Sequence, residues 1–237
     1  MGLILDIINY IGIISFAAAG AMVAIDKETD MFGVVFLSLI TTFGGGLIRD
    51  VIAGQSIGRE LPVVFTSMKM EIIVCIFVAF IVFFLAMILK ERYVKEEATV
   101  EKIINVLDAL GIGVFSAAGT AAYAELSFFI AILMGMLSSI GGSLTRDIIL
   151  NNIPTVLRKR IYALACLAGS AMYYLVAKVL MVGMESADVI GTISCVVVIF
   201  SIRMCATVFR WNMPKAIDFK KIKSKLDAEK EDSVSKV

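Results

Sequence analysis

Seven long apolar segments dominate this sequence, and they restrict the chain to folds that are stable in a lipid bilayer. A helix needs about 20 apolar residues to cross the hydrocarbon core of a membrane. The segments that approach this length are 3–25, 31–53, 72–89, 103–123, 126–150, 161–180 and 189–209. Hydrophobic residues make up 59% of the chain and charged residues only 18%, whereas a soluble domain carries about 25% charged residues. We therefore expect an all-α membrane protein with seven transmembrane helices.

The chain also contains an internal repeat. Gly-Gly-Gly-Leu-Ile-Arg-Asp at 44–50 in the second segment matches Gly-Gly-Ser-Leu-Thr-Arg-Asp at 141–147 in the fifth. Residues 12–20 of the first segment match residues 111–119 of the fourth, and a proline follows each glycine motif. Each copy spans three helices, an odd number, so the second copy must enter the membrane from the opposite face. Inverted repeats are common in transport proteins, where the pathway lies at the repeat interface.

The repeat predicts how the chain is divided. We expect a first three-helix repeat at 1–92, a cytoplasmic linker at 93–102 and a second, inverted repeat at 103–182. A seventh transmembrane helix at 187–210 stands outside the repeat, and a charged cytoplasmic tail covers 211–237.

The two glycine clusters are the first candidates for a functional site. Glycine disfavours a helix interior by about 1 kcal/mol relative to alanine, so a run of glycines within a span predicts a kink or local unwinding. Backbone carbonyls released at that depth are tolerated only where they face protein or a water-filled cavity. This pattern indicates a hinge that lines a pore, with close helix packing as the alternative. The candidate hinge residues are Gly44, Gly45, Gly46, Gly141, Gly142 and Ser143.

An arginine–aspartate pair follows each cluster, Arg49–Asp50 in one repeat and Arg146–Asp147 in the other. A charge at the centre of a membrane helix costs at least about 2.5–3.5 kcal/mol on insertion scales. Because neighbouring residues on a helix point in different directions, we do not expect either pair to neutralise itself. We interpret them as charges that fix the kinked helices and shape the field of a pore. The alternative is an arginine that reaches the membrane surface with its long side chain.

Hydroxyl side chains precede the glycine clusters and recur in the first helix of each repeat. Hydroxyl oxygens can replace part of the hydration shell of a cation, although in helices they also bond to carbonyls of their own helix. The possible pore-lining hydroxyls are Ser15, Ser38, Thr41, Thr42, Ser116, Ser138 and Ser139.

Several classes of function are disfavoured by what the sequence lacks. It has no histidine, and its four cysteines lie in apolar segments without a CxxC pair, so we expect no disulfide and no structural metal. Nucleotide-binding and hydrolase motifs are also absent, so we expect no enzyme activity, no cofactor and no nucleic-acid partner. The acidic residues nearest to a span, such as Asp108, are expected close to its ends.

The basic residues predict the orientation in the membrane. Lysine and arginine are concentrated in the loops on the side opposite to the N-terminus, and cytoplasmic loops carry this excess. They are Lys27, Lys90, Arg92, Lys95, Lys102, Arg158, Lys159 and Arg160. We therefore expect a multi-pass protein of the cell (inner) membrane with its N-terminus outside and its C-terminus in the cytoplasm.

Taken together, the doubled glycine motif with Arg-Asp on the second and fifth of seven helices resembles the prokaryotic trimeric intracellular cation (TRIC) channels. That family lies within a wider group of glycine-transporter-like bacterial membrane proteins, and the resemblance covers roughly residues 5–209. It implies a homotrimer with a pore in each subunit, lined by the second and fifth helices and conducting monovalent cations, chiefly potassium. By motif position it assigns the glycines and the two Arg-Asp pairs to that pore, and Ser143 departs from the third glycine.

Three functions remain open from the sequence. The first is a channel for potassium or sodium ions, favoured by hydroxyl-rich glycine segments without a mid-span carboxylate. The second is a carrier for a small zwitterionic amino acid such as glycine, since helix N-termini suit a substrate carboxylate. The third is a structural membrane protein without transport.

Overall fold

The computed structural model describes residues 2–158 and 161–209, and this part of the chain contains helices and no strands. Within these described residues, seven helices are long and apolar enough to cross a membrane. They are α1 (Gly2–Ile25), α2 (Met31–Ala53, continued by the 3₁₀ turn η1, Gly54–Ile57), α4 (Lys69–Lys95), α5 (Glu97–Tyr123), α6 (Phe128–Ile149), α8 (Tyr162–Tyr174, continued by the π-helical segment η2, Leu175–Leu180) and α9 (Ala187–Val208). Two short helices, α3 (Val63–Thr66) and α7 (Thr155–Arg158), lie in the connections. The all-α fold with seven membrane helices is thus confirmed.

Matching helices begin with matching signals. Asp30 precedes α2 and its side chain accepts a hydrogen bond of 2.7 Å from the Gly33 amide. Ser127 precedes α6 and accepts one of 3.3 Å from the Ile130 amide. Both are helix N-caps, which satisfy amides that have no partner within the first turn. The second helix of each repeat therefore starts at an equivalent position.

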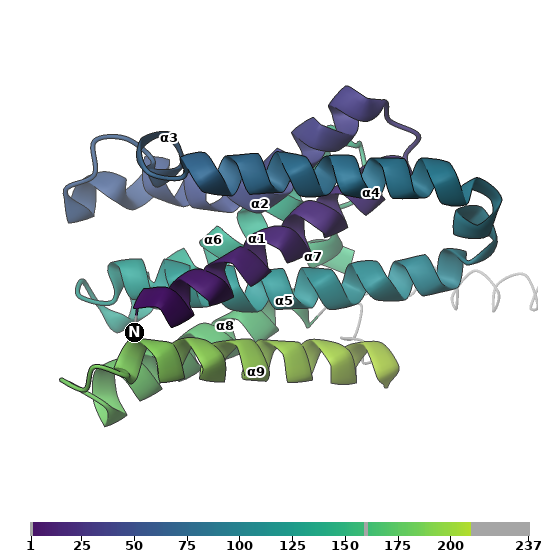
Figure 1. Ribbon diagram of the computed structural model, residues 1–237. Coiled ribbons are helices and arrows are strands. Elements are labelled where there is room, and N and C mark those ends of the chain that lie inside the picture. The colour runs from purple at the N-terminus through teal and green to yellow at the C-terminus, as the bar shows by residue number, and fades with distance from the viewer. Residues whose placement is uncertain (1, 159–160, 210–237) are drawn as a thin grey trace, which may run out of the picture.

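The repeats are inverted in space as well as in sequence. Figure 1 shows α1 and α5 running in opposite directions, with α2 and α6 opposed in the same way. The aromatic rings of Phe16 and Phe115, which occupy matching positions of α1 and α5, stack with 5.2 Å between their centroids. Direct contact between equivalent residues is expected on a pseudo-two-fold axis. The interface between the repeats is therefore the centre of the molecule, and α9 packs against α5 and α8 outside it.

The two ends of the helical bundle carry different connections. The N-terminal face contains the start of α1, the α2–α4 connection and the α5–α6 turn, and the linker face contains the α1–α2 turn and the α4–α5 junction (Figure 1). The segment expected to be a linker, 93–102, is mostly helical, because α4 resumes after a kink at Lys90 and ends at Lys95, and α5 begins at Glu97. Pairs four residues apart, such as Arg92 with Glu96, support helix beyond the apolar segment. The expected tail at 211–237 lies outside the described residues.

The outer surface of the bundle is apolar. Large hydrophobic side chains are exposed along most helices, and α4 buries only Cys75 and Ala79 among its residues. Such a surface is unstable in water and is appropriate to lipid or to a contact between subunits. Polar and charged side chains are instead gathered inside the bundle and at its ends.

Candidate functional site

The glycine clusters lie where α2 crosses α6. A Cβ atom added to Gly45 would collide with the carbonyl oxygen of Ser138, and one added to Gly142 would collide with that of Thr41. These contacts are equivalent in the two repeats, since Thr41 and Ser138 stand three residues before the first glycine of each cluster. Small residues permit this approach of two backbones. The clusters thus bring α2 and α6 into contact near the pseudo-two-fold axis.

Local unwinding at the glycines, expected from the sequence, does not occur. Both α2 and α6 remain α-helical across their clusters, from Met31 to Ala53 and from Phe128 to Ile149. The cost of glycine in a helix is offset by the packing that its missing side chain allows. Backbone carbonyls at this depth are therefore engaged in helix hydrogen bonds, and the use of the clusters as hinges stays a prediction.

The Arg-Asp pair of the first repeat forms an ion pair within itself. Nη2 of Arg49 lies 2.7 Å from Oδ1 of Asp50, and the two side chains are only 9% and 2% exposed. Arg49 also donates to the hydroxyl of Ser138 on α6 at 3.1 Å. The other carboxylate oxygen of Asp50 accepts from the Val63 amide at 3.0 Å, and Arg59 donates to Oδ1 at 3.2 Å. Asp50 thereby holds the start of α3 against α2.

The second repeat reproduces this arrangement with different donors. Nη2 of Arg146 lies 2.7 Å from Oδ1 of Asp147, in side chains that are 4% and 5% exposed. Oδ2 of Asp147 accepts from the amide of Thr155 at 2.7 Å and from its hydroxyl at 2.9 Å. Val63 and Thr155 each follow the proline of their repeat. The shared design is an Arg–Asp pair whose aspartate caps the short helix after the proline.

The expectation that these pairs would not neutralise themselves is therefore wrong. An arginine side chain is long enough to bend around the helix toward the next residue, and burial favours the charged partner within reach. The alternative of an arginine extended to the membrane surface also fails, because all four side chains are buried in the protein.

A cavity lies beside each pair, and the lining of the first is mostly apolar whereas that of the second is mostly polar or charged. The first-repeat cavity, about 60 Å³, is open toward the N-terminal face and is lined by Asn9, Thr42, Arg49, Asp50 and Ser138 among others. The second-repeat cavity, about 540 Å³, is open toward the linker face. Its lining includes Asp26, Lys27, Glu101, Asn105, Asp108, Arg146 and Asp147. The two cavities lie at the Arg–Asp pairs on opposite sides of the glycine crossing and differ greatly in size.

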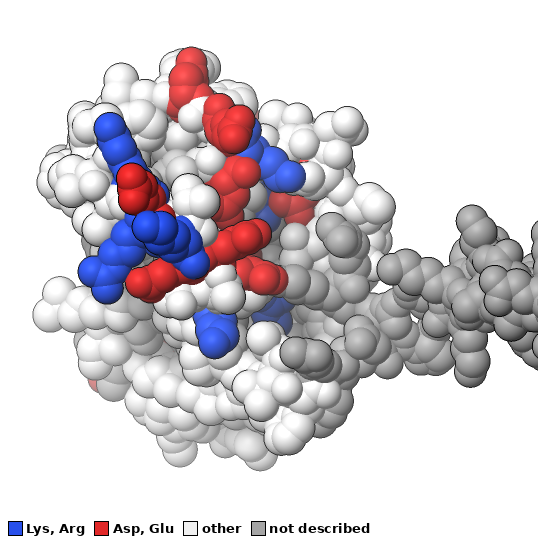
Figure 2. Space-filling model, turned by 90° about the vertical axis from the view of Figure 1, so that its right-hand side faces the viewer, with Lys and Arg blue, Asp and Glu red and all other residues white. Residues whose placement is uncertain are grey.

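Charged side chains surround the larger cavity. Figure 2 views the linker face, where acidic and basic side chains form one group from the upper edge to the middle, above a lower part that is almost entirely uncharged. Burial raises the pKa of Asp26 above its ordinary value, while a hydrogen bond of 3.2 Å from the hydroxyl of Tyr93 opposes that shift. Four carboxylates and two basic groups line the second-repeat cavity, so its wall favours cations over anions.

The predicted hydroxyls are mostly bonded to their own helices. Ser38, Thr41 and Thr42 donate to carbonyl oxygens four residues earlier, at 2.6–2.8 Å. Ser139 donates to the Met136 carbonyl. Of the predicted set, Thr42 and Ser138 line the first-repeat cavity. The remaining members, Ser15 and Ser116, are buried, and the hydroxyl of Ser116 lies 3.0 Å from that of Ser170 on α8.

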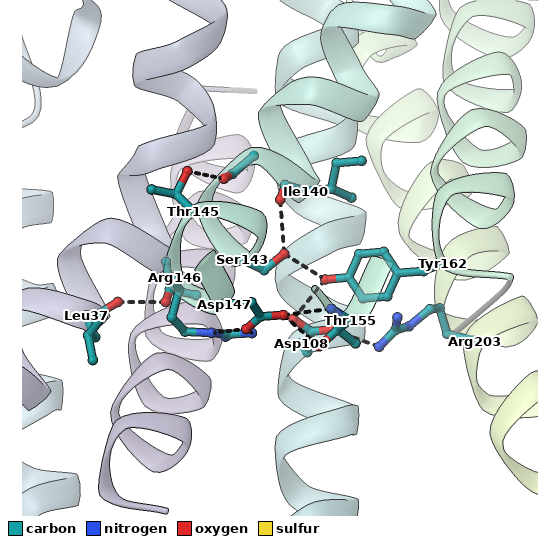
Figure 3. Close-up of polar contacts among 12 residues, drawn as sticks. Leu37, Asp108, Ile140, Ser143, Thr145, Arg146, Asp147, Thr155, Tyr162 and Arg203 are labelled. Atoms are coloured by element: carbon teal, nitrogen blue, oxygen red, sulfur yellow. Dashed lines mark hydrogen bonds and ion pairs between the residues drawn. The ribbon is translucent and has the colours of Figure 1, made fainter. Parts of the chain in front are cut away.

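A buried network centred on Asp108 was not predicted. Oδ2 of Asp108 accepts from Nη2 of Arg203 at 2.8 Å, and Oδ1 accepts from the hydroxyl of Tyr162 at 3.1 Å. Figure 3 shows the carboxylate between these two side chains, with Ser143 at 3.1 Å from the same tyrosine hydroxyl. The network joins α5, α6, α8 and α9. The sequence signal that could have indicated this network is the presence of two opposite charges, Asp108 and Arg203, within apolar segments.

Comparison with known proteins agrees with this geometry. A family model described as "Glycine transporter" matches residues 6–87 and 105–178. The inner membrane protein YadS of Escherichia coli K12, labelled UPF0126, is 31% identical over 209 residues, which cover 87% of this chain and 92% of that protein. The chain belongs to the glycine transporter (UPF0126) family. A further UPF0126 relative, YvgT of Bacillus subtilis, is 28% identical over a region that covers 88% of this chain and 95% of the YvgT chain.

Solved structures extend this family assignment to the fold. A prokaryotic TRIC channel crystallised in 0.5 M KCl matches with a TM-score of 0.74 and 27% identity, over 90% of this chain and all of that one. The TRIC orthologue from Rhodobacter sphaeroides matches with a TM-score of 0.72 and 27% identity, over 87% and 98%. The resemblance to TRIC channels is therefore confirmed. This UPF0126 protein is a multi-pass membrane protein with the fold of a TRIC channel.

Proposed function

We propose that this protein is a membrane channel that conducts monovalent cations, chiefly potassium, along a path between its two repeats. The observation that carries the proposal is the pair of cavities on opposite sides of the α2–α6 crossing, each with a buried Arg–Asp pair in its wall. Charged side chains so deep in a membrane protein are costly and commonly mark an ion or substrate pathway. The matching structures of TRIC cation channels support this choice.

The glycine crossing is the proposed constriction of that path. Gly141 approaches the backbone of Gly45 so closely that an added Cβ would lie 2.9 Å from its Cα atom. A cation can pass only if α2 and α6 separate or bend at this point. Glycines at a crossing favour such motion because they carry no side chains that interlock. We therefore retain Gly44–Gly46 and Gly141–Ser143 as pore and hinge candidates, and the Arg–Asp pairs as charges that shape the entrance field.

The proposed assembly is a homotrimer in the inner membrane. The apolar face of α4 is broad enough to contact lipid or another subunit, and the matching structures include trimeric channels. We propose that the linker face is cytoplasmic because Lys27, Lys90, Arg92 and Lys95 lie there. The second-repeat cavity then opens to the cytoplasm and the first-repeat cavity to the outside.

Electrical recording from purified protein in a planar bilayer tests the proposal. A channel gives discrete unitary currents whose reversal potential follows the potassium gradient. Gly142→Ala, which crowds the crossing, should lower the unitary conductance or the open probability. Absence of unitary currents from protein shown to be folded and inserted would overturn the channel proposal.

A carrier for a small zwitterion such as glycine is the second candidate. The inequality of the cavities, about 540 Å³ on one face and about 60 Å³ on the other, is what a carrier open to one side shows. Saturable uptake of labelled glycine into liposomes, without unitary currents, would favour this function over the channel.

A further inference from the structure

The seventh helix contributes one charged side chain to the interior of the bundle, and its position has a specific consequence. Arg203 of α9 is 5% exposed, and its guanidinium lies 4.1 Å from the ring centroid of Tyr162. From there it donates to Asp108, which lines the second-repeat cavity. Arg203 itself does not line that cavity. The cation thus approaches the carboxylate from behind the cavity wall.

The first repeat has a residue equivalent to Asp108, and within the described part of the chain no arginine of a seventh helix pairs with that residue. The alignment of Gly12 with Gly111 places Asn9 at the position equivalent to Asp108. Asn9 lines the first-repeat cavity just as Asp108 lines the second. A neutral amide at one position therefore corresponds to a carboxylate paired with arginine at the other. Both walls are polar and carry no net charge at this point.

An unpaired Asp108 would change the cavity. Glu101, Asn105 and Asp108 are spaced by four and three residues on α5, so they lie on one face of the helix, and all three line the cavity. Carboxylate and amide oxygens are the preferred ligands of Ca²⁺ and Mg²⁺. A pathway that conducts monovalent cations requires binding weak enough for the ion to leave. A strong divalent site in the wall would obstruct it.

We infer that Arg203 is a specificity-determining residue, which neutralises Asp108 and thereby prevents the second-repeat cavity from binding divalent cations. The inference rests on the proposed function in treating this cavity as part of the ion path. It assigns the seventh helix, which has no counterpart in the repeat, the task of supplying this charge. Replacement of Arg203 by a neutral residue converts the cavity into a divalent-cation site.

The first experiment measures binding without any current. Arg203→Gln protein is purified in detergent at pH 8, above the ordinary range of carboxylate pKa values, and its thermal unfolding is followed with and without CaCl₂. Calcium should raise the Tm of Arg203→Gln by about 2–4 °C at several times its Kd. The unsubstituted protein and Arg203→Lys should show no such shift. An Arg203→Gln protein that is folded and insensitive to calcium overturns the inference.

Two control variants distinguish calcium binding at Asp108 from a general effect of removing one positive charge. Asp108→Asn combined with Arg203→Gln reproduces the neutral amide of the first repeat, so the calcium shift should disappear. Arg92→Gln also removes one positive charge and leaves Glu96 unpaired, but on the exposed surface of α4, so it should gain no shift. A shift in either variant contradicts the assignment to Asp108. A merely structural role of Arg203 predicts lower stability without any response to calcium.

The second experiment uses currents, and its comparison of Asp108→Asn with the double variant still tests the inference if Arg203→Gln alone does not fold. In bilayers, millimolar Mg²⁺ on the side of the second-repeat cavity should block Arg203→Gln and leave the unsubstituted channel unaffected. Asp108→Asn alone leaves the charge of Arg203 uncompensated, so cation conductance should fall by about twofold or more, and the double variant should restore it. Equal conductance in Asp108→Asn and the double variant overturns the inference. Absence of current in the unsubstituted protein refutes the channel proposal and leaves the calcium experiment standing.

Discussion

At the scale of single residues, the two aspartates of the glycine motifs, Asp50 and Asp147, each accept several hydrogen bonds from buried or half-buried groups. Asp147 accepts from the Arg146 side chain and from both the amide and the hydroxyl of Thr155. Asp147→Asn leaves a buried guanidinium without its counter-ion and should lower the free energy of unfolding by about 3–5 kcal/mol. Thr155→Val removes one hydroxyl and should cost only about 0.5–1.5 kcal/mol. Thermal unfolding in detergent compares them, and equal losses would show that the ion pair adds nothing.

Asp26 is the residue whose protonation should affect conduction. Burial, with the nearby carboxylates of Glu97 and Glu101, raises its pKa, while the Tyr93 hydroxyl and Lys27 lower it. With the pKa raised, Asp26 takes up its proton at a higher pH than an ordinary aspartate, near 4. Acidification on the side of the second-repeat cavity should therefore lower the cation conductance. The decrease should begin at a higher pH than it would for a carboxylate with an ordinary pKa. Asp26→Asn should lack this step, and an identical pH profile in that variant would exclude Asp26 as its source.

At the scale of helices, alanine substitutions in the glycine clusters can distinguish a role in helix packing from a role in helix flexibility. Gly142→Ala places a Cβ against the Thr41 carbonyl, whereas the nearest atom to a Cβ at Gly46 is Nη2 of Arg49, at 3.8 Å. Gly142→Ala should therefore destabilise the protein by about 1–3 kcal/mol. Gly46→Ala should be neutral or should stabilise α2 by up to about 1 kcal/mol. Reduced conductance in Gly46→Ala, with unchanged stability, would show that the cluster also acts as a hinge.

These helices also show how far sequence reasoning extends. Apolar length located every transmembrane helix, and the motif match at Gly44 and Gly141 correctly predicted the inverted repeat, because both depend on local pattern. The glycines were expected to unwind the helix because the partner backbone that stabilises them is 93 to 101 residues away along the chain. Asp108 was expected near the end of its span because the apolar segment begins only at residue 103. The helix itself begins at Glu97, within polar residues, so Asp108 lies well inside α5. The role of Arg203 could not be predicted because its partner, Asp108, lies 95 residues away along the chain on another helix.

At the scale of the whole molecule, the inverted repeat requires that the two cavities open on opposite sides of the membrane. The orientation argument predicts that the linker face, with its lysines and arginines, lies in the cytoplasm. Cysteine reporters at Glu185 and Glu91 test this prediction, because these residues are exposed on the N-terminal and linker faces respectively. Cys75, Cys166 and Cys195 are buried, so they contribute little background, and Cys205→Ser removes the remaining thiol.

A membrane-impermeant maleimide applied to intact cells should label Glu185→Cys at once and Glu91→Cys only after lysis. The opposite pattern would reverse the proposed orientation and assign the large second-repeat cavity to the outside. Equal labelling of both reporters would indicate that the protein inserts in two orientations. Such dual insertion is expected only for a chain with weak charge bias between its loops. The concentration of basic residues on the linker face provides that bias and predicts a single orientation, with the Asp108–Arg203 pair near the cytoplasmic entrance.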